Sequence, residues 1–109
     1  MAEVEERILR IRGHKGVMGL LIVDENGKVL RTTMNTTGDK DQPNPRQIAA
    51  KITDLAKKAR SVVRDIDPQN DLTFFRVRTK KSEVMVAPDK NLFLIVLQAT
   101  VPKEEQDGN

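Results

Sequence analysis

The sequence predicts an α+β domain in which a helix, two strands, a second helix and three strands form one antiparallel five-stranded sheet with flanking helices. Two observations carry this prediction. Residues 17–23 (VMGLLIV) and 92–97 (LFLIVL) carry apolar residues on both alternating faces, which is typical of strands covered on both sides. Residues 48–66 instead carry apolar side chains at helical spacing. The 109 residues suffice for one core, so we expect a single domain over 1–101 and a polar, flexible tail over 102–109.

The first half of the chain predicts a helix followed by a hairpin. Val4, Ile8 and Ile11 recur at helical spacing and predict a short amphipathic helix. The strand at 17–23 then meets the turn DENG at 24–27, where Asn-Gly is expected to supply positive φ angles. Residues 28–34 form the more polar second arm, and a polar loop follows over 35–46.

The second helix carries the widest apolar stripe in the chain. Asn44 is the expected N-cap, Pro45 suits the first turn, and Pro68 ends the helix after Asp67. The stripe consists of a main row and a parallel row of residues: Ile48, Ile52, Leu55, Ala59, Val62 and Ile66, then Ala49, Ala56 and Val63. This width suits a helix that packs on a sheet and on a second helix.

The last three strands are predicted at 72–79, 83–87 and 92–99, joined by short turns into an antiparallel meander. The two strands that are apolar on both faces should be central and adjacent. Hairpin and meander connectivity then gives the strand order 2-1-5-4-3, which leaves the second and third strands at the edges.

The third strand is long and apolar for an edge strand, with Phe74 and Phe75 on opposite faces. It directly follows the wide helix. Both features are explained if the third strand pairs with its symmetry mate and the second helix packs on its own mate. We therefore predict an isologous two-fold homodimer with one continuous sheet.

Composition excludes several classes of function. The net charge of +3 is mildly basic, but three Phe with no Tyr or Trp offer few stacking partners for nucleic acid. The chain has no cysteine, and its longest apolar run is far shorter than a membrane span. No apolar signal core is found near the first residue, so a cytosolic or cytoskeletal protein without membrane insertion is expected.

No arrangement of residues predicts catalysis, a cofactor or a metal. His14 is the single histidine, and the glycines of residues 13–19 follow a helix and open a strand, the reverse of a dinucleotide fingerprint. The acidic run 65–71 superficially resembles a calcium loop but lacks its glycine and terminal glutamate. Helix termination, with Asx side chains bonding backbone amides, is the preferred interpretation.

Two strings in the second half carry a family resemblance: RDIDPQNDLTF at 64–74 and VMVAPDK at 84–90. They closely resemble the roadblock family of dynein light chains, as does the opening MAEVEE. The resemblance implies a non-catalytic homodimeric subunit of the dynein motor that binds the intermediate chain. It places the protein with cytoplasmic or axonemal dynein, while residues 35–47 depart from the family pattern.

The resemblance also implies site residues and one alternative. The dimer-forming pieces are the helix 48–64 and the strand 72–78. The expected interface residues are Ile52, Leu55, Ala56, Ala59, Val63, Leu72, Phe74 and Arg76. Ile8 and Ile11 are the candidate partner-binding residues. Because relatives of this fold scaffold or regulate small Ras-like GTPases, a GTPase regulator that uses Arg76 and Arg78 remains the alternative function.

Overall fold

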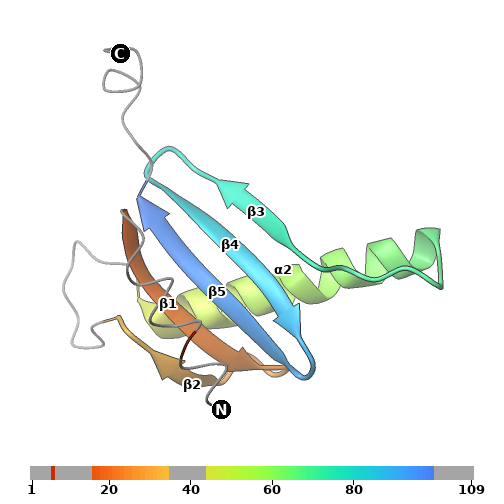
Figure 1. Cartoon of the computed structure of the whole chain (residues 1–109), viewed down its shortest axis with the longest axis horizontal. Coiled ribbons are helices and arrows are strands. Elements are labelled where there is room, and N and C mark those ends of the chain that lie inside the picture. The colour runs from red at the N-terminus through yellow and green to blue at the C-terminus, as the bar shows by residue number, and fades with distance from the viewer. Residues whose placement is uncertain (1–5, 7–15, 35–43, 100–109) are drawn as a thin grey trace.

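The computed structural model describes Glu6 and residues 16–34 and 44–99, which form one antiparallel sheet backed by a long helix (Figure 1). Its elements are β1 (Val17–Asp24), β2 (Val29–Thr32), α2 (Pro45–Ile66), β3 (Phe75–Arg78), β4 (Ser82–Asp89) and β5 (Leu92–Ala99). The strand order is β2-β1-β5-β4-β3. The predicted order and the central position of the two apolar strands are therefore confirmed.

The hairpin turn between β1 and β2 depends on Asp24 and Gly27. The Gly27 amide donates to the Asp24 carbonyl at 3.0 Å, and the Asp24 carboxylate accepts from the amides of Asn26 and Lys28 at 2.8 and 2.9 Å. Gly27 alone has a positive φ in this turn, 84°, so the prediction of positive angles at both Asn26 and Gly27 was wrong. A type I turn closed by a glycine needs only the last residue in the left-handed region.

Helix α2 begins and ends as predicted. The Asn44 side chain accepts from the Arg46 amide at 2.9 Å, and Pro45 occupies the first turn, where an absent N–H costs nothing. At the other end, Asp67 is extended with φ −145° and its amide still donates to the Val63 carbonyl. Pro68 excludes the α conformation at Asp67, so the helix ends there.

The sheet has two apolar faces of different character. The face toward α2 holds the main core, built from Leu21, Val23, Val84, Val86, Phe93, Ile95 and Leu97 together with Ala49 and Ala56 of the helix. On the opposite face, called here the open face because α2 does not cover it, Leu20, Ile22 and Val96 are buried and Val17, Met85 and Leu94 are half-buried around them. Figure 1 views the sheet from this open face, with α2 behind it.

Strand β3 is shorter than predicted. It starts at Phe75, opposite Val86, rather than at Leu72, so residues 72–74 are not part of the sheet. The segment 67–74 instead runs back beside the end of α2 (Figure 1), because Asp71 forms ion pairs with Arg60 and Arg64 of the helix. These contacts hold residue 71 beside the helix and away from β4. The chain therefore begins to pair with β4 only at Phe75.

Three predicted segments lie wholly or largely outside the described residues. They are the N-terminal helix with Ile8 and Ile11, of which Glu6 alone is described and is helical, the loop over 35–43 and the tail over 102–109. His14 also lies in this part of the chain.

We predict that Gly19→Ala destabilises the domain. A Cβ at Gly19 would overlap Cγ of the buried Met34, so the Met34 side chain or the strand must move. Such overpacking costs about 1–3 kcal/mol. Urea unfolding should show that Gly19→Ala lowers the free energy of unfolding by this amount in the wild-type background. In the Met34→Ala background the same substitution should lower it hardly at all, because the obstructing atoms are absent. Equal losses in both backgrounds would contradict this explanation.

Candidate interaction surfaces

Helix α2 carries apolar side chains on two adjacent faces. At 100° per residue, the rows predicted from the sequence lie about 90° apart around the helix. In the predicted parallel row, Ala49 and Ala56 are buried against the sheet and Val63 is half-buried. Thr53 is buried beside them, and Ala49, Thr53 and Ala56 are called here the inner row. The outer row is Ile48, Ile52, Leu55, Ala59, Val62 and Ile66, and its members are half-buried or exposed. The sheet thus covers the inner row completely but the outer row only in part, at Ile48 and Ile52, which pack against the main core.

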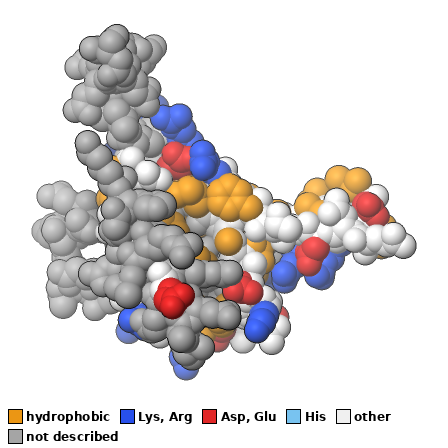
Figure 2. Space-filling model, viewed as in Figure 1, with side chains coloured by type: hydrophobic (Ala, Val, Ile, Leu, Met, Phe, Trp, Pro, Cys, Tyr) orange, Lys and Arg blue, Asp and Glu red, His pale blue; other side chains and the backbone are white. Residues whose placement is uncertain are grey.

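Exposure along the outer row increases toward the C-terminal end of α2. Leu55, Val62 and Ile66 are 42%, 55% and 81% exposed. The end of the helix projects beyond β3 (Figure 1), and hydrophobic atoms are visible at this projecting end in Figure 2. Large aliphatic side chains at helical spacing on a projecting helix are typical of a surface that another helix covers.

The structure places the eight predicted interface residues in different surroundings. Leu55, Phe74 and Arg76 are exposed, and Ala59, Val63 and Leu72 are half-buried. Ile52 packs partly against the main core, and Ala56 is completely buried there. The side chain of Ala56 is therefore already surrounded by its own protomer. Val62 and Ile66, absent from the predicted interface, have larger exposed fractions than any of the helix residues in that set.

The projecting end of α2 is braced by Asp71. Its carboxylate accepts a 3.1 Å hydrogen bond from the Arg64 guanidinium and one of 2.8 Å from the Leu72 amide. Arg60 Nε lies 3.3 Å from the same carboxylate, as an ion pair without a directed hydrogen bond. The Arg64 hydrogen bond and then the Leu72 amide lower the pKa of the Asp71 carboxyl below its ordinary value.

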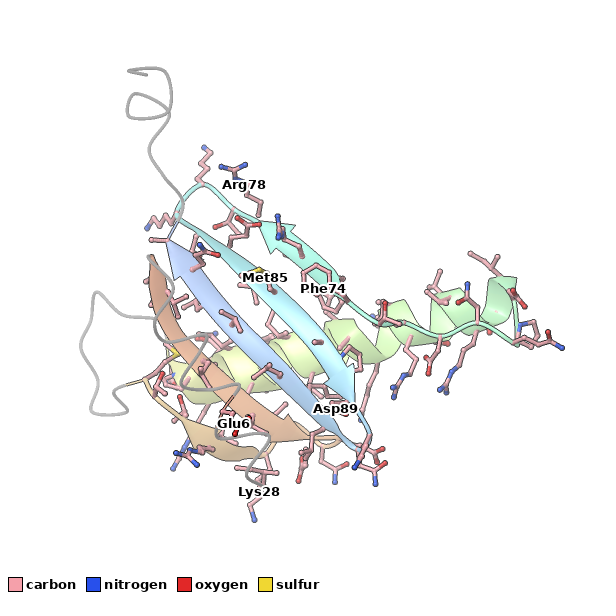
Figure 3. The ribbon with its side chains drawn as sticks, in the orientation of Figure 1. Glu6, Lys28, Phe74, Arg78, Met85 and Asp89 are labelled. Atoms are coloured by element: carbon pink, nitrogen blue, oxygen red, sulfur yellow. The ribbon has the colours of Figure 1, made fainter. Side chains whose placement is uncertain are left out.

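Strand β3 is an edge strand that carries basic side chains on the open face. Among the described strands it pairs with β4 alone. Arg76 lies 2.7 Å from Glu83 and also 5.9 Å from the centre of the Phe74 ring, so its guanidinium is held over the sheet. Arg78 lies on the same face near the end of β3 (Figure 3).

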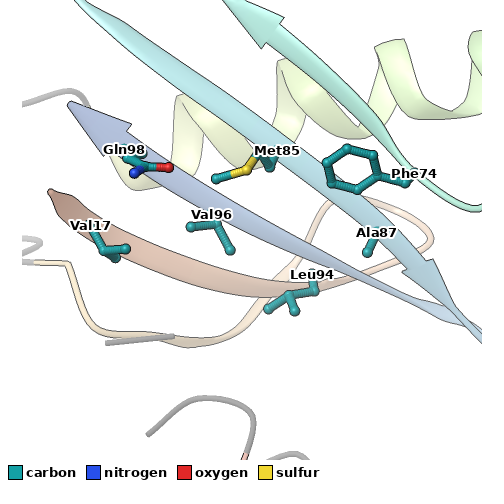
Figure 4. A pocket seen from close by; sticks show the side chains of 7 residues that line it. All are labelled: Val17, Phe74, Met85, Ala87, Leu94, Val96 and Gln98. Atoms are coloured by element: carbon teal, nitrogen blue, oxygen red, sulfur yellow. The ribbon is translucent and has the colours of Figure 1, made fainter. Parts of the chain in front are cut away.

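A pocket of about 210 Å³ lies on the open face beside these arginines. Its lining is apolar apart from one amide and consists of Val17, Phe74, Met85, Ala87, Leu94, Val96 and Gln98. Figure 4 shows Phe74 at the end near β3 and Val17 at the end on β1. The sequence indicated that the open face needs a cover, but it did not predict this pocket.

The residues of the acidic run 65–71 cap and turn the chain after α2. The Asp67 carboxylate accepts from the Gln69 amide at 3.1 Å, and the Asn70 side chain accepts from the Asp71 amide at 2.9 Å. The predicted Asx turns are therefore confirmed.

Within residues 16–34 and 44–99, no group of three acidic, histidine or cysteine side chains is placed to hold a metal ion. The helices described contain no segment with the length and hydropathy of a membrane span.

The long helix behind a β2-β1-β5-β4-β3 sheet is the arrangement of a roadblock domain. The Roadblock/LC7 domain matches residues 3–99, nearly the whole chain. The protein therefore belongs to the Roadblock/LC7 domain family.

Three solved structures with the same fold come from bacteria. A Roadblock/LC7 domain from Streptomyces avermitilis has a TM-score of 0.67 at 17% identity, over 82% of this chain and 71% of that one. The gliding protein MglB from Thermus thermophilus has a TM-score of 0.67 at 18% identity, over 98% of this chain and 78% of that one. MglB from Myxococcus xanthus has a TM-score of 0.68 at 12% identity, over 92% of this chain and 78% of that one. At these identities the likeness shows the fold alone.

The Asp71 brace predicts a specific pH dependence. The pKa of Asp71 is lowered by folding, so its contribution to stability is complete above the unfolded value and is lost as the pH falls through the folded value. In Arg64→Gln the pKa should rise toward the ordinary value, and the stability difference from wild type should shrink below about pH 4. Carboxyl-carbon NMR titration of Asp71 measures the pKa, and urea unfolding between about pH 2 and 7 measures the stability.

Arg46→Gln is the matched control, because Arg46 is exposed at the opposite end of α2. The pKa of Asp71 should be the same in this variant as in wild type. An unchanged Asp71 pKa in Arg64→Gln would contradict the brace.

Proposed function

We propose that the protein is a homodimer held together by the outer row of α2 and the free edge of β3. The observation that carries this proposal is the exposure of Val62 and Ile66 on a helix end that extends past its own sheet. A second copy related by a two-fold axis supplies both a partner helix and a partner edge strand. Burying each large aliphatic side chain contributes about 1.5–3 kcal/mol.

The dimer serves as a non-catalytic light chain of dynein that binds the intermediate chain and holds two copies of it together. Membership of the Roadblock/LC7 family supports this function at the level of the domain. The finer assignment rests on the resemblance of residues 64–74 and 84–90 to dynein light chains. A homodimer offers two equivalent surfaces, which suits a subunit that joins two identical chains. The corresponding location is the cytoplasm and cytoskeleton, including the axoneme if the dynein is ciliary.

Regulation of a small Ras-like GTPase is the second candidate. Relatives of this fold regulate such GTPases, and the fold similarity to the bacterial gliding protein MglB is the observation that supports this second candidate. Arg76 is already engaged by Glu83 and the Phe74 ring, which leaves Arg78 as the better placed cation for such a role. GTP hydrolysis measured with and without the protein tests this candidate directly.

We predict that Val62→Glu breaks the homodimer without unfolding the protomer. Val62 is 55% exposed in the protomer, so its replacement opens no cavity there. In an isologous dimer the lost burial counts twice, and the dissociation constant should rise about 100-fold or more. Sedimentation velocity at micromolar concentration measures the association.

Ser61→Glu is the matched control, since Ser61 is exposed one position away on a different side of α2. It should remain dimeric, and both variants should keep the wild-type circular dichroism spectrum. A wild-type protein that sediments as a monomer, or a Val62→Glu variant that stays dimeric, would overturn this interface.

Affinity capture from an extract of the source organism tests the function. Wild type should recover dynein intermediate and heavy chains, and Val62→Glu should recover about tenfold less, because a monomer loses the gain from two linked binding sites. Recovery of small GTPases without dynein subunits would instead favour the second candidate. Ser61→Glu serves as the control here as well.

A further inference from the structure

The end of β3 and the turn into β4, residues 76–81, form a basic surface that is called here the basic turn. Its four basic residues are all exposed: Arg76, Arg78, Lys80 and Lys81. The Thr79 hydroxyl closes the turn, because it donates to the Ser82 carbonyl at 2.9 Å and accepts from the amides of Lys81 and Ser82 at 3.2 and 3.0 Å. The backbone of the turn is thus held in one shape without a ligand.

The positive charge of the basic turn is only partly balanced within the sheet. Glu83 is the single acidic residue within 76–83. It lies opposite Arg78 in the register of β3 and β4, yet its carboxylate lies 2.7 Å from Nε of Arg76 instead. Within the described part of the chain, neither Arg78 nor Lys81 forms an ion pair. Arg78 lies at the end of β3 next to the turn (Figure 3), so this surplus charge faces solvent.

The chain leaves the sheet beside the basic turn and then becomes acidic. Ala99 at the end of β5 pairs with Ser82 at the start of β4, so their Cα atoms are about 5 Å apart. Figure 1 shows the end of β5 at this corner of the sheet. In residues 100–109, Lys103 is the single basic residue, and three residues are acidic: Glu104, Glu105 and Asp107. The sequence 104–107 (EEQD) is called here the acidic segment.

The acidic segment is close enough to reach the basic turn. Neighbouring strands lie about 4.8 Å apart, so Arg78 on β3 is about 10 Å from Ala99 across β4. Glu104 follows Ala99 by five residues, which span at most about 17 Å. A linker this short gives an effective concentration on the order of millimolar. Even the weak attraction between exposed charges then keeps a measurable fraction of the segment on the turn.

We propose that the acidic segment binds the basic turn of its own chain and competes there with acidic segments of other proteins. The inference goes beyond the proposed function and needs no second copy, because β5 and the turn belong to one protomer. The contact is electrostatic, so salt weakens it. A strongly acidic partner displaces the segment from Arg78 and Lys81, whereas a weakly acidic one does not. The segment thereby makes the basic turn selective among acidic partners.

A spin label on the segment measures its contact with the turn. The chain has no cysteine, so Asn109→Cys takes a single nitroxide, which should broaden the amide NMR signals of residues 79–82 at low salt. Glu104→Gln, Glu105→Gln and Asp107→Asn together neutralise the segment but keep its length. This neutral-segment variant should reduce the broadening about twofold or more, as should 1 M salt in wild type, where the Debye length is about 3 Å. Equal broadening in the two proteins would overturn the proposal.

Two double variants locate the contact. Arg78→Gln with Lys81→Gln removes two positive charges from the basic turn and should reduce the broadening as neutralising the segment does. Arg46→Gln with Lys57→Gln removes the same two charge types from exposed positions of α2, on the other side of the sheet, and should leave the broadening as in wild type. An equal reduction in both double variants would mean attraction to the net charge alone and would contradict a contact at the turn.

A fluorescent peptide of eight glutamates measures the competition. At low salt, fluorescence anisotropy should show severalfold tighter binding to the neutral-segment variant than to wild type, because the turn is no longer occupied. Adding Arg78→Gln and Lys81→Gln should abolish this gain, and adding Arg46→Gln and Lys57→Gln should preserve it. Equal affinity of wild type and the neutral-segment variant, or a gain that survives the loss of Arg78 and Lys81, would show that the segment does not compete at the turn.

Discussion

The mismatch between the length of α2 and the width of the sheet is the constraint from which most of the structure follows. The 22 residues of α2 extend for about 33 Å, whereas five strands are only about 19 Å wide. A helix that crosses this sheet must project beyond one edge, and it projects beyond β3 (Figure 1). The apolar pattern nevertheless continues to Ile66, past the last strand able to cover it. The sequence therefore specifies more apolar helix than one protomer can bury.

Asp71 makes this projection a defined surface. Two arginines, one helical turn apart, meet the single carboxylate of the returning chain and fix the end of α2 to the segment that leads into β3. Because all three groups are partly solvent-exposed, the contact orders the helix end more than it stabilises the domain. The same contact delays the start of β3, so the exposed aliphatic row and the free strand edge are positioned together.

The sequence predicted the strand order, both ends of α2 and its two apolar rows, because each depends on local chemistry: alternation in 17–23 and 92–97, the Asn44 cap and the Pro68 stop. It did not predict which row faces the sheet, because Ala49 and Ile52 are both apolar and only packing decides between them. The start of β3 was misplaced because Asp71 reaches residues seven and eleven positions earlier. The pocket on the open face was not predicted because it depends on Ala87 lying opposite Leu94, and periodicity does not reveal the register between two strands.

The adjacent phenylalanines at the start of β3 connect the two surfaces. Phe75 packs against the main core on the side of α2. Phe74 remains 49% exposed and lies at one end of the pocket on the open face. Alternation along an extended chain requires this division, since neighbouring side chains point to opposite faces. In the proposed homodimer, a second copy therefore contacts the β3 edge and the outer row from the edge and the helix side of the sheet.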